Sequence, residues 1–168
     1  MTISMYNASV PVFQQHLSAL NAILIKAEKP VNNDMKPETL LNARLFPDMF
    51  DFTRQIQIAT DFAKGVSARL AGLEIPEYED NETTFTQLHA RITKTLQFIS
   101  SIKPEQINGS DDHEIITRPG TPKEKKFSGE SYLLHYGLPH FFFHVITAYA
   151  ILRNNGIEIG KRDYMGDF

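Results

Sequence analysis

Three long stretches of the chain carry large apolar residues at alternating intervals of three and four, and this spacing limits the fold more than any other feature. On an α-helix such residues line one face, so each stretch predicts an amphipathic helix. The predicted helices span about 9–29, 50–71 and 82–102. Their apolar stripes are Phe13, Leu17, Leu20, Leu24 and Ala27, then Phe52, Ile56, Ala59, Ala63, Val66, Leu70 and Leu73, then Phe85, Leu88, Ile92, Leu96 and Ile99.

A fourth helix is predicted from Gly129 or Ser131 to about Asn154, where Gly156 is a suitable stop. Pro139 lacks a backbone N–H, so we expect a kink or a restart there. Four long amphipathic helices predict an all-α fold, an antiparallel four-helix bundle that forms one domain over residues 1–168.

The segments between the helices give weaker signals. A helical turn is predicted after Pro37. Segments 114–117 and 125–128 flank a Pro-Gly turn, which predicts a short β-hairpin between the third and fourth helices; an ordered surface loop is the alternative. We expect the tail, residues 157–168, to pack back as an extended segment.

Composition narrows the classes of function. The net charge is -3 and the pI about 6.1, with no basic stripe, so nucleic acid is not an expected partner. No apolar run approaches ~20 residues, so no membrane span is expected. Cysteine is absent, which excludes disulfides, thiolate ligands and a cysteine nucleophile, and fits a cytoplasmic protein.

The strongest candidate site lies in the fourth helix. His140 and His144 are four residues apart, which places both imidazoles on one helical face. Two imidazoles at that separation can share a divalent metal ion such as zinc or nickel. The alternative is a pair of helix histidines that are hydrogen-bonded to neighbours or partly exposed.

Several segments carry a resemblance to a known group of proteins. The matching segments are 138–139, 143–144, 147–153, 155–156 and 160–163 near the C-terminus, and 55–59, 61 and 63–65 in the second helix. Together they resemble an uncharacterised bacterial family within the DinB/YfiT-like superfamily. Its members are four-helix bundles, and the resemblance implies stress-associated proteins or metal-dependent enzymes.

Where the superfamily has a metal site, it uses three histidines, one from the second helix and two from the fourth. His140 and His144 match the second pair, but residues 50–71 contain no histidine. Aligning Asp61 with the acidic residue that often follows the family's first histidine puts Gln57 or Ile58 at the ligand position. The helical wheel instead places Gln55 close to the apolar stripe, so Gln55 and Gln57 both stay candidates for a weak third ligand.

Asp61 and the hydroxyls of Tyr132, Tyr136 and Tyr149 are further candidates for the pocket. A salt-bridged acid and tyrosines packed in the core are the alternatives.

Two classes of function follow. The superfamily suggests a metal-dependent transferase or hydrolase with its site where the second and fourth helices face each other. The alternative is a non-catalytic bundle that binds a small ligand or a protein partner and in which the metal site is degenerate. The run Phe141–Phe143 covers three faces of a helix, so one ring needs a cover outside the bundle centre. A dimer partner or the first helix could supply this cover. From this apolar surface and the superfamily resemblance we expect a homodimer, the commonest oligomer.

Overall fold

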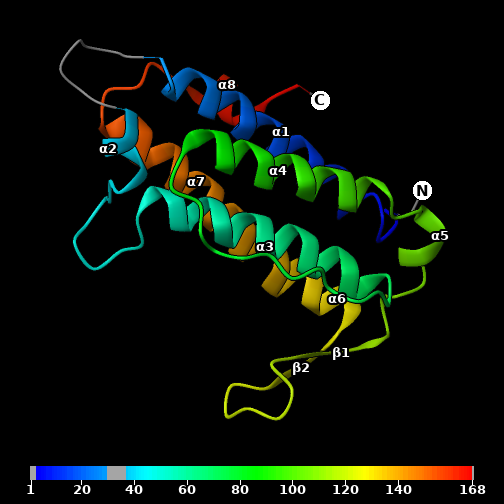
Figure 1. Ribbon diagram of the computed structural model, residues 1–168. Coiled ribbons are helices and arrows are strands. Elements are labelled where there is room, and N and C mark those ends of the chain that lie inside the picture. The colour runs from blue at the N-terminus through cyan, green and yellow to red at the C-terminus, as the bar shows by residue number, and fades with distance from the viewer. Residues whose placement is uncertain (1–2, 30–36, 168) are drawn as a thin grey trace.

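Four long helices form the body of the protein, which a computed structural model describes over residues 3–29 and 37–167. They are α1 (Val10–Ala27), α3 (Phe52–Leu70), α4 (Phe85–Ser100) and α7 (Leu138–Asn154), and they pack side by side as a bundle (Figure 1). The predicted all-α four-helix bundle is confirmed, and each predicted helix is present within a few residues of its expected bounds.

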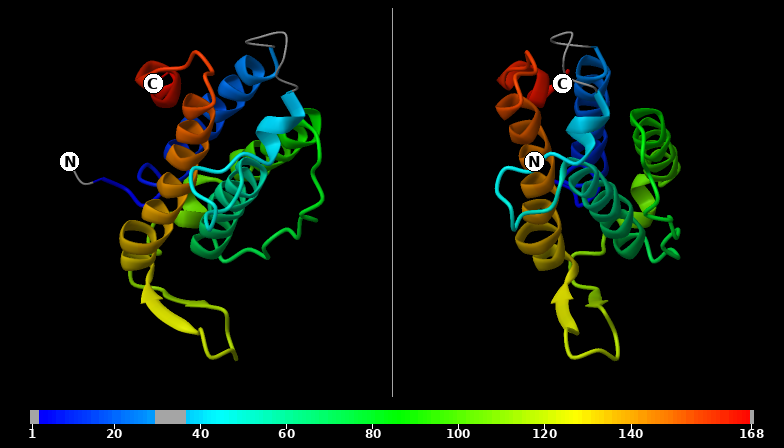
Figure 2. Two further views of the ribbon diagram at one scale, coloured as in Figure 1. Left: turned by 90° about the vertical axis from the view of Figure 1, so that its left-hand side faces the viewer. Right: turned by 60° about the vertical axis from the view of Figure 1, so that its left-hand side comes forward.

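One long connection determines which helices of the bundle are parallel and which are antiparallel. Residues 71–84 have no helix or strand and run back along the bundle from the end of α3 to the start of α4 (Figure 1). As a result α3 and α4 point the same way, whereas α1 and α7 run opposite to them (Figure 2). Of the three most closely packed pairs, α3 with α7 and α1 with α4 are therefore antiparallel, whereas α3 with α4 is parallel.

The core follows the apolar stripes. Asp51 begins α3 by accepting the amide of Arg54 at 2.9 Å, and Thr84 begins α4 with a capping box. Every residue of the α1 stripe is buried. The other two stripes are also buried except for Leu96, which is partly buried, and Leu73, which is 38% exposed. Leu73 lies beyond Gly72, whose φ of +65° ends the helix in the left-handed conformation.

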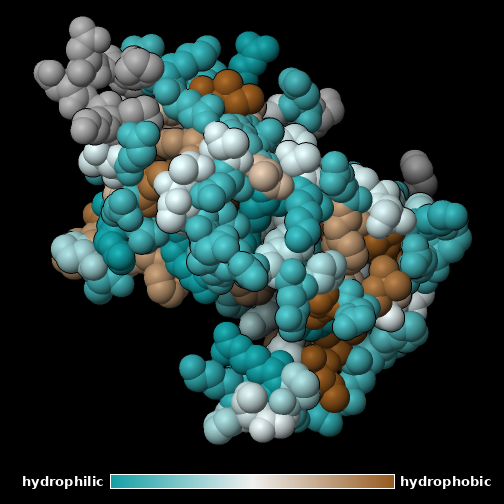
Figure 3. Space-filling view, viewed as in Figure 1, coloured by the Kyte–Doolittle hydropathy of each residue, from teal (hydrophilic) through white to brown (hydrophobic). Residues whose placement is uncertain are grey.

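Shorter helices and a β-hairpin lie in the connections between the four long helices. Two helical turns, α2 (Pro37–Leu41) and α5 (Pro104–Ile107), lie in connections, and the first confirms the turn predicted after Pro37. Strands β1 (Glu114–Thr117) and β2 (Lys125–Ser128) pair antiparallel, so the predicted hairpin is present. It projects beyond one end of the bundle (Figure 1). Hydrophobic surface gathers near the base of the hairpin, where Ile116 is 36% exposed, whereas the face over α4 is mainly hydrophilic (Figure 3).

The expected break at Pro139 takes the form of a π-helical turn. Helix α6 (Gly129–Ser131) runs through η1 (Tyr132–Gly137) into α7, and the Leu138 amide donates to Leu133 O, five residues back. A π turn is wider than an α turn, and it precedes a proline that cannot donate to the previous turn. A Cβ on Gly137 would lie 2.7 Å from Val66 Cγ2, so the absent side chain lets η1 approach α3 closely.

The tail packs back on the bundle as predicted, but the expected extended conformation is wrong for residues 161–165, and residue 168 lies outside the described residues. Residues 161–165 form a short helix, α8 (Lys161–Met165), which packs on α1. Asp163 accepts the Gly160 amide at 2.8 Å and pairs with Lys26 of α1 at 2.6 Å. These contacts fix a turn that is too short to produce a periodic apolar pattern. Among the residues that the structure describes, no helix has the length and apolar character needed to cross a membrane.

Candidate functional site

Four aromatic side chains follow one another at four-residue intervals along η1 and α7. They are Tyr132, Tyr136, His140 and His144, and we refer to them as the aromatic ladder. The ring centroids of Tyr132 and Tyr136 are 5.7 Å apart, and those of Tyr136 and His140 are 4.3 Å apart. Because the π turn continues into α7, the two tyrosines and the two histidines share one side of the helix.

The face of α3 opposite the ladder presents residues spaced by seven, which is two helical turns. Gln55 contacts His144, and Arg69 donates to the Tyr132 hydroxyl at 3.1 Å. Between them the Phe62 ring lies nearly parallel to both imidazoles, with centroids 4.8 Å from His140 and 6.2 Å from His144. One face of α3 therefore covers the whole ladder.

The hydrogen bonds of Gln55 fix the protonation of His144. The amide nitrogen of Gln55 donates to the Phe50 carbonyl at 3.1 Å, so its amide oxygen must face the histidine. That oxygen lies 2.7 Å from His144 Nδ1, which must therefore carry the proton and donate. His144 Nε2 keeps its lone pair, and among the described residues no side chain or backbone group donates to it.

His140 is held in the same tautomer by a different partner. Its Nδ1 lies 2.7 Å from the Tyr136 carbonyl oxygen, which can only accept. Nδ1 therefore donates, and Nε2 is again the nitrogen with a free lone pair. An imidazole whose Nδ1–H is tied to an oxygen while Nε2 stays free is the arrangement found in histidines that bind metals.

Burial keeps His144 neutral. The residue is 8% exposed, and this burial, together with the neighbouring His140 and Arg54, lowers its pKa from 6.5 to about 4. Removal from water disfavours the charged imidazolium, and nearby cations disfavour it further. At neutral pH the Nε2 lone pair of His144 is therefore available to a ligand.

The two glutamines proposed as third ligand have separate surroundings. Gln57 accepts from Arg54 Nη1 at 2.9 Å and donates to Glu82 at 2.8 Å, on the side of α3 that faces α4. Its amide is thus engaged away from the histidines. Gln55 is the one that reaches His144, but its oxygen accepts from Nδ1–H and is not aimed at the free Nε2.

Of the other predicted pocket residues, some lie near the histidines and some do not. Tyr136 belongs to the ladder. Asp61 pairs with Arg91 at 2.8 Å and with Lys64 at 3.0 Å, and its side chain also lines a cavity described below. Tyr149 packs against Tyr164 of α8, with ring centroids 6.1 Å apart, so it faces α8 and is not part of the ladder.

The donor set does not complete a metal centre of the kind that the superfamily resemblance implies. Within residues 3–29 and 37–167 no three His, Cys, Asp or Glu side chains converge to hold an ion. Phe62 covers the side of the histidines where a third donor from α3 would be needed. Two imidazoles alone fall short of the three protein ligands typical of catalytic zinc.

Phe62 and Arg69 were missed at the level of sequence. Both carry a detectable signal, because they follow Gln55 at intervals of seven residues and so share its helical face. The four-residue spacing of the ladder was also present in the sequence, but it crosses Gly137 and Pro139, where a break was expected.

Comparisons with known proteins agree with this architecture. A family model described as "Domain of unknown function (DUF1993)" matches residues 5–165. A crystal structure of a DinB family member protein from Shewanella denitrificans is 36% identical to this chain, with a TM-score of 0.88. The match covers 97% of this chain and 92% of that chain. A search of curated proteins gave no match. The chain therefore belongs to the DUF1993 family and is a DinB-like four-helix-bundle protein.

Proposed function

We propose that this protein binds a small molecule along the aromatic ladder, with His144 Nε2 as a neutral acceptor for a group of that molecule. The observation that carries the proposal is the fixed state of His144. Its Nδ1–H is tied to Gln55 and its pKa is about 4, so Nε2 offers an accessible lone pair at neutral pH.

A neutral His144 is better suited to accept a hydrogen bond from a ligand than to act as a general base. A general base works best when its pKa lies near the working pH, and a base with a pKa of about 4 is weak at pH 7. The rings of Phe62 and Tyr136, which pack against His140, are only partly buried and line a cavity, so they offer apolar surface for the body of a ligand. The ladder is thus suited to a molecule with an aromatic or planar part and a donor that reaches His144.

A direct test follows His144 by proton–nitrogen NMR of the histidine side chains while a fragment library is added at pH 7. We expect bound fragments to shift the His144 Nε2 and Phe62 signals together. The matched control is His113, an exposed histidine before β1, which should not respond. Fragments that bind elsewhere and never move His144 would contradict the proposal.

A metal-dependent transferase or hydrolase is the second candidate, and one observation favours it. Both histidines are anchored through Nδ1 with Nε2 free, as metal-binding histidines are. Such an enzyme would need its third donor from a group other than those described above. When bound, the ion would activate a water or a thiol cosubstrate.

Calorimetric titration with zinc and with nickel at pH 7.5 decides between the candidates, using protein without a histidine tag. We expect the wild type and His144→Ala to take up each metal equally, because two imidazoles do not complete a site. Stoichiometric uptake by the wild type that is lost in His144→Ala would favour the metalloenzyme. His113→Ala is the control for adventitious binding to an exposed histidine.

We also propose that the protein acts in the cytoplasm as a homodimer. The cytoplasmic location rests on the absence of cysteine from the sequence. The homodimer rests on two exposed apolar side chains of α7: Phe143 is 54% exposed and Ile146 is 50% exposed.

A further inference from the structure

A cavity of about 170 Å³ lies between the hairpin and the tyrosine end of the aromatic ladder. Its lining includes Phe62 and Arg69 from α3, Thr117 and Arg118 from the hairpin, and Tyr132 and Tyr136 from the ladder. Neither histidine lines the cavity, but Phe62 and Tyr136 also contact the His140 ring, so these two side chains connect the cavity to the histidine end of the ladder.

The basic side chains around this cavity are not neutralised. Within the described residues neither Arg69 nor Arg118 forms a salt bridge. Lys125 adds a third positive charge, with Nζ 5.9 Å from the centroid of the Tyr136 ring. Arg69 Nη1 donates to the neutral Tyr132 hydroxyl and Gly65 carbonyl, so both guanidinium groups keep their positive charge without an anionic partner, and this favours an anion.

One carboxylate also lines the cavity, and its charge is already offset. Asp61 Oδ1 lies 2.8 Å from Arg91 Nη2 and 3.0 Å from Lys64 Nζ, both of which belong to buried residues on the α4 side of α3. Asp61 is thus committed to two cations that do not line the cavity, and the positive charge of Arg69 and Arg118 remains.

The backbone at Arg118 supports a role for this residue. Its φ of 51° is the only left-handed value at a non-glycine residue within the described chain. Residues held in such conformations concentrate at ligand-binding sites. The turn is fixed by Thr121, whose hydroxyl donates to the Arg118 carbonyl at 2.9 Å, so the strained residue has a defined place at the cavity.

We propose that the cavity binds a carboxylate or phosphate group of the small molecule, with Arg69 and Arg118 as its donors. This inference rests on the proposed function and names the class of its ligand. The oxyanion lies at the Tyr132 end, and the rest of the molecule extends along Tyr136 and Phe62 toward His140 and His144. The ligand is therefore an organic acid or a phosphate ester with a planar part.

The test uses inorganic phosphate and acetate as separate probes in NMR titrations of the full-length protein at constant ionic strength. We expect saturable shifts at the Thr117 and Arg118 amides and at the Arg69 side chain. The probe that binds more tightly identifies the class of acid. Arg118→Gln should weaken binding by about tenfold or more, the loss typical of one hydrogen bond between charged groups.

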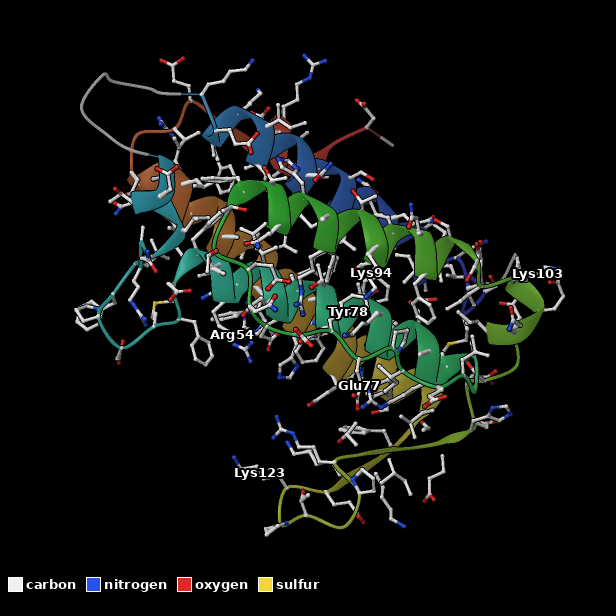
Figure 4. All side chains as sticks on the ribbon, viewed as in Figure 1. Arg54, Glu77, Tyr78, Lys94, Lys103 and Lys123 are labelled. Carbon is white, nitrogen blue, oxygen red and sulfur yellow. The ribbon has the colours of Figure 1, made fainter. Side chains whose placement is uncertain are left out.

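Lys123→Gln is the matched control, because Lys123 is an exposed cation on the same hairpin loop that does not line the cavity (Figure 4). It should leave binding nearly unchanged. Equal weakening in the Lys123 and Arg118 variants would show diffuse attraction and overturn the site, as would the absence of any saturable shift. Arg69→Gln provides a second, independent loss if the Arg118 variant alters the hairpin.

His144→Gln separates this inference from the proposed function. It should bind phosphate or acetate as the wild type does, because the oxyanion does not contact His144. If neither probe binds while fragments still shift His144, only the oxyanion site is wrong. If the probes bind but no fragment ever shifts His144, the proposed function is wrong and the oxyanion site stands.

Discussion

The two sides of α3 carry polar groups in opposite states. Toward α4, the side chain of Arg91 is 2% exposed and donates to Thr60 at 2.7 Å, to Asp61 at 2.8 Å and to Glu82 at 2.9 Å. Toward α7, each histidine of the ladder uses Nδ1, and its Nε2 has no hydrogen-bond partner among the residues that the structure describes. A saturated buried network stabilises a structure, whereas unsatisfied acceptors near a surface are available to a ligand.

The Arg91 network also fixes the connection that sets the helix directions. Arg91 donates to the Glu79 carbonyl at 3.1 Å and pairs with Asp80 at 3.0 Å, so it holds residues of the 71–84 segment. Tyr78 of the same segment lies between cations, with Lys64 Nζ 3.7 Å and Lys94 Nζ 4.2 Å from its ring centroid (Figure 4). The α4 side of α3 therefore has a structural role and the α7 side a binding role.

The substitution Arg91→Ala should have the largest effect, and it tests whether the α4 side of α3 has a structural role that is separate from the α7 side. It leaves the largely buried carboxylate of Glu82 without its cation, whereas Asp61 keeps Lys64, and removal of one member of a buried ion pair costs about 3–5 kcal/mol. Urea denaturation should show this loss, while the pKa of His144 stays near 4 in the folded variant. Lys94→Ala, which removes an exposed cation from the same helix, should change stability far less. Similar small losses in both variants would show that the network is not structural.

The second effect is a dependence of stability on pH that belongs to the ladder. The pKa of His144 is about 4 when folded and 6.5 when exposed, so below pH 6.5 the unfolded chain binds a proton that the folded protein does not. The stability present above pH 6.5 is lost as pH falls to about 4, by up to about 3 kcal/mol.

Urea denaturation of the wild type and His144→Gln across this range measures the contribution. The variant should lose most of the dependence, and what remains should come in part from His16, whose pKa burial also lowers. Parallel curves for the two proteins would mean that His144 titrates normally and that its neutral state is not enforced.

A smaller effect should follow from Gly137→Ala. The new Cβ would lie 2.7 Å from Val66 Cγ2, and overpacking of this kind costs about 1–3 kcal/mol. Combining it with Val66→Ala should cost less than the two single changes added together, because the smaller side chain relieves the clash. Gly160→Ala is the control, since nothing lies within 4 Å of its added Cβ. Strict additivity would show that the close approach of η1 and α3 does not matter.

The least effect on the fold is expected from Ile146→Asp, because Ile146 is 50% exposed. An exposed substitution should change protomer stability by less than about 0.5 kcal/mol. If α7 forms the proposed dimer interface, light scattering should give twice 19.1 kDa for the wild type and 19.1 kDa for the variant. A wild-type mass of 19.1 kDa at micromolar concentration would exclude the homodimer.

The helices were predictable because their signal is local. Residues such as Phe52, Ile56 and Ala59 repeat within a few turns, and their burial needs no knowledge of the partner helix. The shared direction of α3 and α4 depends on the 71–84 segment, which has no periodic pattern and is held by the distant Arg91. Local spacing does not contain that contact.

The site was predictable only in part, for the same reason. Spacing alone paired His140 with His144, and the helical wheel rather than the alignment on Asp61 selected Gln55, the glutamine that contacts His144. The tautomer of His144 depends on the Phe50 carbonyl, which orients Gln55 from a loop. The cavity forms because the hairpin packs against η1. No local pattern in the sequence predicts this contact.

The π turn links this geometry to a simple count of residues. Such a turn holds one more residue than an α turn, and each residue of an α-helix rotates the chain by about 100°. Loss of one residue from η1 would therefore restore a regular α-helix and rotate the segment directly before it, the hairpin with Arg118 and α6, around the helix axis relative to α7. The register of a single helical turn, more than any side chain, decides whether the arginines and the histidines face the same ligand.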